Sequence, residues 1–189
     1  MKRTIIASIL GVVASLGMVA SSYGQGSIWF DNYNNANVSG PNSGFSSPIS
    51  IQGGGLIPSS FTVDLYYALG TVTDPNAGNP LASPIGSLLL SRPVSATAPG
   101  YVSAAIATAL NYVSGPITFQ VAAHGTLAGQ DYFGRSAVLT LPSIATGTTL
   151  PGYLDGLQSF SVQVVPEPTT FALAGIGSAM LLIFRRRNA

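Results

Sequence analysis

The residue types that could support hydrolytic chemistry are few in this chain and lie close together in the sequence. The one histidine, His124, is followed by Asp131 and Ser136, and these are the three residue types of a nucleophilic triad. The stretch Gly134–Val138 begins like a nucleophile elbow, but it has no second glycine and no strand–helix alternation around it. We therefore predict no catalytic residue. His124 is expected to face solvent on a strand, with a hairpin loop around Gln130–Tyr132.

A second polar group, Asp31–Asn37, has the oxygen-bearing side chains that calcium prefers. The EF-hand spacing fails, because Ala36 stands where glycine is required and Asn42 stands where a bidentate glutamate should be. An Asn-rich loop that uses its side chains for local turns is the better interpretation. A lone histidine without cysteine cannot build a zinc site unless carboxylates contribute. We predict neither a metal site nor a cofactor.

Glycoside hydrolysis requires two carboxyl groups on opposite sides of a sugar. Residues 25–165 contain aspartates at isolated positions and no glutamate, so no pair is nominated: Asp31, Asp64, Asp74, Asp131 and Asp155. Several tyrosines are candidates for stacking on sugars, although packing is their usual role: Tyr66, Tyr67, Tyr101, Tyr112, Tyr132 and Tyr153.

Charge is scarce and unevenly distributed. Only 7% of the 189 residues are charged, whereas about 25% is usual. Arg92 and Arg135 are the only basic residues between positions 25 and 165, and with five aspartates they give that region a formal charge of −3. Two arginines cannot neutralise a run of phosphates, so we expect no nucleic-acid partner. The chain has no cysteine, which excludes disulfides.

The first 24 residues have the layout of a secretory signal peptide. Basic residues at positions 2 and 3 precede the apolar run Ile5–Val19, and small residues follow it. We expect export through the Sec translocon and cleavage by signal peptidase between Gly24 and Gln25. Cleavage after position 20 or 22 is also compatible with the pattern.

The other end of the chain combines three features. Pro166-Glu167-Pro168 must end any preceding strand, because proline fixes φ and lacks a backbone N–H. The uncharged run Phe171–Phe184 has 14 residues, or 16 with the two preceding threonines. This is short of the roughly 17–20 residues of a membrane span. Arg185–Arg187 follow and would stay cytoplasmic. Taken physically, this is a linker followed by a membrane anchor.

Together, Val165–Ala189 resemble the PEP-CTERM sorting signal of Gram-negative bacteria, with the three parts in the same order and spacing. The resemblance implies that an exosortase recognises Pro166, Glu167 and Pro168 and processes the tail. It also implies that the apolar run is a transient inner-membrane anchor, with Arg185, Arg186 and Arg187 as the stop signal. Such proteins are expected at the cell surface or outside the cell, in association with extracellular polysaccharide and biofilm matrix.

Between the two ends, the sequence has the period of β-strands. Residues 61–69, 117–124 and 159–164 alternate apolar and polar side chains, which is typical of antiparallel strands buried on one face. Shorter candidates have the same composition: Ser27–Phe30, Pro48–Gln52, Ile85–Leu90 and Ser136–Leu141. Residues 101–113 suit a helix by composition and a strand by their neighbours, and we favour the strand.

Short strands joined by Gly-, Pro- and Asn-rich turns predict an all-β fold with one antiparallel β-sandwich-like domain in residues 25–165. We expect a signal-peptide helix in residues 1–24 and a C-terminal transmembrane helix within the sorting segment, residues 166–189. Residues 25–165 also resemble a small β-rich domain found on PEP-CTERM proteins, which implies no particular activity.

Two classes of function remain. The first is a non-catalytic surface or matrix protein with a structural or binding domain. The alternative is a secreted hydrolase or lyase that acts on polysaccharide through an unrecognised site of aspartates and His124. Gathering of these residues in one concave pocket would favour the enzyme, and their scatter would favour the non-catalytic protein.

Overall fold

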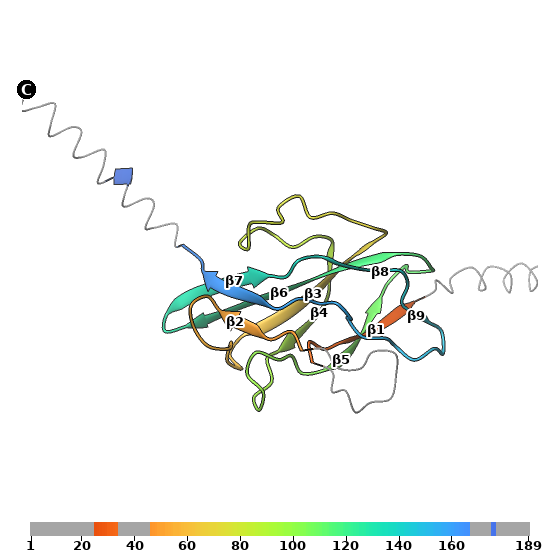
Figure 1. Ribbon diagram of the computed structural model, residues 1–189, viewed down its shortest axis with the longest axis horizontal. Helices are drawn as coiled ribbons and strands as arrows, with labels where there is room; N and C mark the ends of the chain where they lie inside the picture. The colour runs from red at the N-terminus through yellow and green to blue at the C-terminus, as the bar shows by residue number, and fades with distance from the viewer. Residues whose placement is uncertain (1–24, 34–45, 167–174, 177–189) are drawn as a thin grey trace, which may run out of the picture.

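The computed structural model describes residues 25–33, 46–166 and 175–176 (Figure 1). Within these ranges the chain forms ten strands: β1 (Gly26–Phe30), β2 (Ile49–Ile51), β3 (Thr62–Leu69), β4 (Ser87–Pro93), β5 (Ala105–Ala109), β6 (Ile117–Leu127), β7 (Gln130–Arg135), β8 (Leu139–Leu141), β9 (Ala145–Thr146) and β10 (Phe160–Val164). The predicted signal-peptide helix lies outside the described residues, as does nearly all of the predicted C-terminal helix.

The larger sheet has the strand order β2-β10-β7-β6-β3-β4, and β8 pairs with β6 next to the end of β7. Its long central strand, β6, pairs with β3 on one side. The register runs from Ile117 opposite Leu69 to His124 opposite Thr62. All pairings in this sheet are antiparallel except that of β10 with β2. The last strand that the structure describes, β10, therefore lies inside the sheet, between β2 and β7, rather than at its edge.

The smaller sheet has the order β5-β1-β9 and is antiparallel. Ile28 and Phe30 of β1 are fully buried, and they belong to the same apolar cluster as the inward-facing residues of β3 and β6. The all-β prediction is confirmed for residues 25–33 and 46–166, which form two sheets that bury their side chains in one common core.

Strand β6 differs from the predicted half-buried strand, because both of its faces are buried. Phe119 and Val121 face the core, as predicted, but Thr118 and Gln120 on the opposite face are also completely inaccessible. The connection from β3 to β4 covers this second face. Its backbone donates hydrogen bonds from Val72 N to Thr118 Oγ1 at 3.0 Å and from Ile85 N to Gln120 Oε1 at 2.8 Å. The polar residues of the alternating pattern thus bind a covering loop instead of water.

Two other local predictions need correction. The hairpin expected around Gln130–Tyr132 is present as β6 and β7, but its turn lies earlier, at Ala128–Gly129, and Gln130–Tyr132 already pair with β6. The strand expected at Ser136–Leu141 is confined to Leu139–Leu141. The residues before it are not paired as a strand because the side-chain hydroxyl of Ser136 accepts the Val121 amide at 3.0 Å, in place of a backbone carbonyl.

The ambiguous segment 101–113 contains a strand, β5, and no helix. It pairs with β1 from Ala105 opposite Phe30 to Ala109 opposite Gly26. Asn111 then turns the chain with φ of 62°. The strand preference is confirmed, and the partner strand β1 decides the conformation of an Ala-rich stretch whose own propensity favours a helix.

Candidate functional site

His124 lies on the outer face of β6 and is half exposed, as predicted, and it has a carboxylate partner. Its Nδ1 is 3.4 Å from Asp64 Oδ2 on the neighbouring strand β3. The hydroxyl of Ser91 on β4 donates to the other oxygen of Asp64 at 2.5 Å. A nucleophilic triad requires the histidine between the acid and the nucleophile, so that the imidazole can take the proton. Here the carboxylate stands in the middle, so the imidazole of His124 is not placed to take the proton of Ser91.

The three residue types of a triad, for which no catalytic role is predicted from the sequence, are not brought together. Asp131 accepts a hydrogen bond from the hydroxyl of Thr126 at 2.6 Å across the β6–β7 hairpin. Ser136 is buried, and its hydroxyl donates to the Ala137 carbonyl at 2.7 Å. His124 pairs with neither residue, because its carboxylate partner is Asp64.

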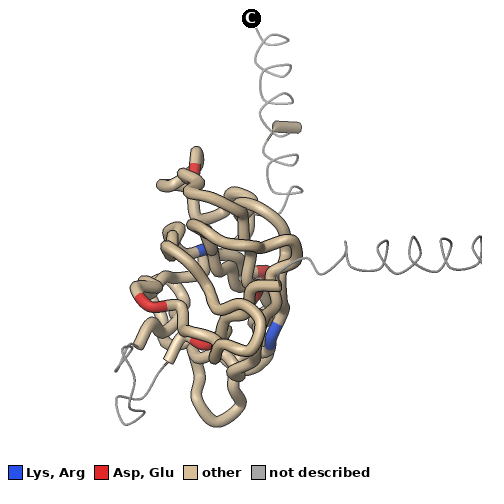
Figure 2. The backbone as a smooth tube through the Cα atoms, turned by 90° about the vertical axis from the view of Figure 1, so that its right-hand side faces the viewer, with Lys and Arg blue, Asp and Glu red and all other residues tan. Residues whose placement is uncertain are grey.

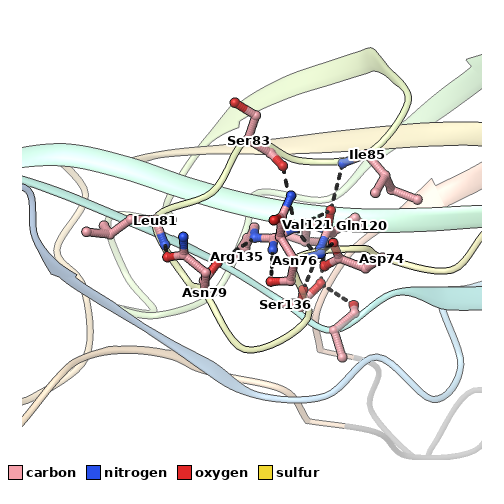
Figure 3. A network of polar contacts seen from close by, with 11 residues as sticks. Asp74, Asn76, Asn79, Leu81, Ser83, Ile85, Gln120, Val121, Arg135 and Ser136 are labelled. Carbon is pink, nitrogen blue, oxygen red and sulfur yellow. Dashed lines mark hydrogen bonds and ion pairs between the residues drawn. The ribbon is translucent and has the colours of Figure 1, made fainter.

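Sequence reasoning missed the most highly connected polar group, which centres on Arg135 at the end of β7. The side chains of Arg135 and Asp74 are only 3% and 4% exposed, and Arg135 Nη1 lies 2.7 Å from Asp74 Oδ2. Arg135 also donates to the carbonyl oxygens of Asn76 and, at 3.1 Å, Asn79, both in the β3–β4 connection. Figure 3 shows these contacts converging on the arginine from the β3–β4 connection.

Gln120 of β6 completes this network. Its Nε2 donates to Asp74 Oδ2 at 3.2 Å and to the Ser136 carbonyl at 2.8 Å, while its Oε1 accepts the Ile85 amide. Burial raises the pKa of the Asp74 carboxyl, but hydrogen bonds from the Asn76 amide, Arg135 and Gln120, together with the charge of Arg135, outweigh burial and lower that pKa. Most of these contacts attach the β3–β4 connection to β6 and β7.

One sequence signal could have found this pair. Residues 25–165 contain only two basic residues, and one of them, Arg135, lies between segments that the sequence predicts to be strands. A buried arginine requires a carboxylate and several carbonyl groups to satisfy its donors. Which of the five aspartates it uses depends on the path of the β3–β4 connection, and this is set by tertiary structure.

The predicted Asn-rich loop is described only at its start, and residues 34–45 lie outside the described ranges. Asp31 Oδ1 accepts the Tyr33 amide at 2.9 Å, which is the local turn that the sequence predicts. Asn32 is fully buried and binds backbone groups of two distant segments. Asp31 thus makes the predicted local turn, whereas the contacts of Asn32 are long-range and were not predicted by the loop interpretation.

The tyrosines divide into packed and exposed residues. Tyr112 is buried, with its hydroxyl donating to the Gly115 carbonyl at 2.8 Å, and Tyr132 packs at 6.0 Å between ring centroids against Phe61. Tyr153 stacks with Trp29 at 6.4 Å. Tyr66 and Tyr67 are half-buried on β3. The ring centroid of Tyr101 lies 5.4 Å from that of Tyr33. Tyr33 was not among the tyrosines selected from the sequence.

The acidic residues do not gather in one pocket. Asp64, Asp74 and Asp131 have the separate partners described above, and Asp31 and Asp155 line different cavities. Figure 2 shows the acidic and basic positions dispersed over the described part of the molecule. Within the described ranges no three histidine or carboxylate side chains come close enough to hold a metal ion.

The sorting segment follows the folded sheet without a spacer. The Val165 amide donates to the Asp131 carbonyl at 2.8 Å, next to the last strand, and the following Pro166 is exposed. Glu167, Pro168 and Arg185–Arg187 lie outside the described residues. At the other end Gln25 is the first described residue and β1 begins at Gly26, whereas Gly24 lies outside.

Residues 164–187 match the family model of the PEP-CTERM protein-sorting motif. The match covers the proline–glutamate–proline sequence, the apolar run and the three arginines, so the resemblance inferred from these residues is confirmed. No curated protein and no solved structure matches the chain.

The chain is therefore an exported protein directed to the cell surface by a carboxyl-terminal signal. More particularly, it carries a PEP-CTERM sorting motif and is targeted to an exosortase. Among the helical residues that the structure describes, none forms a segment long and apolar enough to span a membrane.

Proposed function

We propose that the protein is an exosortase-processed component of the cell surface or extracellular matrix, in which the β domain has a non-catalytic structural or binding role linked to exopolysaccharide and biofilm. The observation that carries this proposal is the sorting motif at residues 164–187, which continues directly from β10. Export by the Sec translocon, cleavage by signal peptidase and transient anchoring in the inner membrane complete the proposed route.

The two ends of the β domain support this route. Cleavage between Gly24 and Gln25 leaves the whole of β1 intact, because that strand begins at Gly26. Processing after Pro166 likewise leaves β10 in place between β2 and β7. A domain whose first and last strands lie inside their sheets can lose both flanking segments without losing a strand.

The arrangement of polar side chains supports a non-catalytic role. His124 is not placed between Asp64 and Ser91, so it cannot take the proton of that hydroxyl, and Arg135 and Asp74 neutralise each other beneath a loop. Within the described part of the chain, every buried side-chain nitrogen and oxygen has a hydrogen-bond partner. Catalytic groups are commonly left available for substrate, and these buried groups are occupied by the protein itself.

The test is maturation in a host that carries an exosortase. An epitope tag in the β domain is followed by fractionation and gel mobility for the parent chain and for a variant with Pro166, Glu167 and Pro168 replaced by alanine. We expect the parent to mature and leave the membrane, and the triple-alanine precursor to accumulate there. A matched control replaces the adjacent Thr169 and Thr170 with alanine and should mature normally.

Maturation of the triple-alanine variant at the parent's rate would show that the tail is only a linker and anchor. The matrix role has its own readout. In a host that makes no exopolysaccharide, the mature protein should move from the cell-associated fraction to the medium. Equal retention in both hosts would contradict the polysaccharide link while leaving the sorting route intact.

A further inference from the structure

Three chain segments meet around Asn32 at the end of β1. Asn32 Nδ2 donates to the carbonyl oxygens of Ser47 and Gly100, each at 2.9 Å, and its Oδ1 accepts the Val102 amide at 2.7 Å. The side chain is fully buried, so these contacts are shielded from water. They hold the end of β1, the segment before β2 and the β4–β5 connection in one geometry.

The β4–β5 connection closes on itself and presents Tyr101. The Ser95 amide donates to the Tyr101 carbonyl at 2.7 Å, and the Tyr101 amide donates to the Ala98 carbonyl at 3.1 Å. Gly100 has φ of 79°, a conformation that favours glycine, and its amide donates to the Ile57 carbonyl at 2.9 Å. Tyr101 therefore projects from a constrained turn.

Tyr33 and Tyr101 form an edge-to-face pair on this surface. Their ring centroids are 5.4 Å apart and their planes are inclined by 67°. Tyr33 is 46% exposed, and the Tyr101 hydroxyl is held by Ser46 Oγ at 2.9 Å. Tyr101 is half-buried, so the pair presents one exposed ring and one partly covered ring, both oriented by their neighbours, to a ligand.

A cavity of about 470 Å³ lies beside this pair and is lined by Asp31, Tyr33, Ser95, Ala98, Tyr101 and Val102. This volume falls within the range of about 300–1,000 Å³ found for small-molecule sites. Aromatic faces suit the apolar faces of a sugar ring, while the Asp31 carboxylate and the Ser95 hydroxyl can bind its hydroxyl groups. The six lining residues include a carboxylate and no basic residue, so the charge of the site disfavours binding of an acidic sugar.

We propose that this cavity binds an uncharged sugar unit of an extracellular polysaccharide, with the ring against Tyr33 and Tyr101 and a sugar hydroxyl donating to Asp31. This inference rests on the proposed matrix function and deepens it by giving the ligand class and the site. Burial raises the pKa of the Asp31 carboxyl, against hydrogen bonds from the Tyr33 and Asn32 amides. The carboxylate is thus less hydrated than a surface group, which strengthens a hydrogen bond from a sugar.

The test is calorimetric titration of the full-length protein in detergent with neutral hexasaccharides (cellohexaose, laminarihexaose and maltohexaose) and with an acidic oligomannuronate. We expect saturable binding of at least one neutral sugar and none of the uronate. Tyr33→Ala and Tyr101→Ala should each raise Kd at least about tenfold, which corresponds to about 1.4 kcal/mol. Asp31→Asn should weaken binding of the neutral sugar and reduce the discrimination against the uronate.

Tyr153→Ala is the matched control, because it removes an equally large ring from the separate stack with Trp29 and should leave Kd unchanged. Tyr33→Trp keeps an aromatic face and should retain binding, which separates loss of stacking from loss of folding. The inference is overturned if no neutral sugar binds saturably, or if Tyr153→Ala weakens binding as much as Tyr33→Ala does.

Maturation in the exosortase host separates this inference from the function on which it rests. The Tyr33 and Tyr101 variants should mature as the parent does, since neither residue belongs to the sorting segment. If they mature normally and bind sugar as the parent does, the cavity assignment fails and the sorting route stands. If the parent itself does not mature, the proposed function fails irrespective of the binding result.

Discussion

At the scale of single residues, Arg135 shows how a chain with little charge uses a buried ion pair. Its guanidinium has five donors in a planar fork, and the contacts to Asp74, Asn76 and Asn79 place acceptors on several of them. A buried pair of this kind gains little over an apolar pair, but loss of one partner leaves an unpaired charge in the interior. The arginine therefore matters most as the attachment of the β3–β4 connection.

We predict that Arg135→Ala lowers the free energy of unfolding by about 3–5 kcal/mol, because Asp74 is left buried without its cation. Urea denaturation of the full-length protein, followed by the fluorescence of its single tryptophan, measures the change. Arg92→Ala is the control: Arg92 is less buried, and its one hydrogen bond, to the Ser103 carbonyl at 3.2 Å, is weaker. Equal effects of the two variants would contradict the assigned role of Arg135.

Asp74 also predicts the direction of a pH effect. Its pKa is lowered in the folded state, so the unfolded state binds more protons and the stabilisation is complete above the unfolded pKa of about 4. It is lost as pH falls through the lower folded value. Asp31 and Asp155 have pKa values raised by burial and act in the opposite sense, their cost being relieved as they protonate.

The variant Asp74→Asn isolates this effect from the other two carboxyl groups. We expect the difference in unfolding free energy between parent and variant to be largest near about pH 6 and to shrink as the pH falls below about 4, towards the lowered pKa of Asp74 in the folded parent. Urea denaturation at a series of pH values provides the comparison. A difference that stays constant over this range would assign the loss to shape rather than to charge.

The sequence places His124 on the outward face of its strand because period-two alternation assigns faces. It does not identify the partner, Asp64, because that residue lies on β3 and the pairing register brings the two together. The same limit applies to Tyr33 and Tyr101. Their proximity depends on the contacts of Asn32 with remote backbone groups, which no local pattern encodes.

At the scale of elements, the alternating pattern predicts strands well and their environment less well. The segments that became β3, β6 and β10 all show the pattern, and all three are strands. The pattern implies water on the polar face, yet the polar face of β6 lies beneath a connection rich in Gly, Pro and Asn. A covering loop contributes no periodic signal, so its position cannot be read from composition.

Gly134 on β7 provides a prediction about strand spacing. A Cβ added at this position would lie 2.4 Å from the Ser161 carbonyl oxygen and 2.8 Å from the Val162 Cα, both backbone atoms of β10. Gly134→Ala should therefore force β7 and β10 apart and cost about 1–3 kcal/mol of unfolding free energy, as overpacking does. Thermal unfolding followed by circular dichroism measures the loss.

The control for that experiment is Gly54→Ala, where the nearest atom to an added Cβ is Ile51 Cβ at an ordinary 3.4 Å. This variant should unfold like the parent. If Gly134→Ala were equally stable, β10 would have room to move from β7. The close packing assigned to the strand that precedes the sorting segment would then be wrong.

At the scale of the whole molecule, the two ends of the chain are more informative than its interior. Charge, apolar length and proline spacing act locally, so the sorting motif can be recognised from consecutive residues and the match at 164–187 confirms it. The ligand surface of the β domain is built from segments that are far apart in the chain. This explains why the destination of the protein can be read from its sequence and the binding site requires the fold.

The last prediction concerns Arg185–Arg187. Uncut precursor is needed to measure anchoring alone, so the arginines are replaced by glutamine in the chain whose Pro166, Glu167 and Pro168 are already alanine. The 14-residue run Phe171–Phe184 is shorter than a full span of about 20 residues. Without the cytoplasmic charge it should no longer hold the precursor, since the positive residues set its orientation. Fractionation should then find the full-sized precursor in the soluble exported fraction.

The control is Arg92→Gln in the same background. It changes an arginine of the β domain and should leave the precursor in the membrane. A glutamine variant that remains there with the parent's efficiency would show that the apolar run anchors without its arginines.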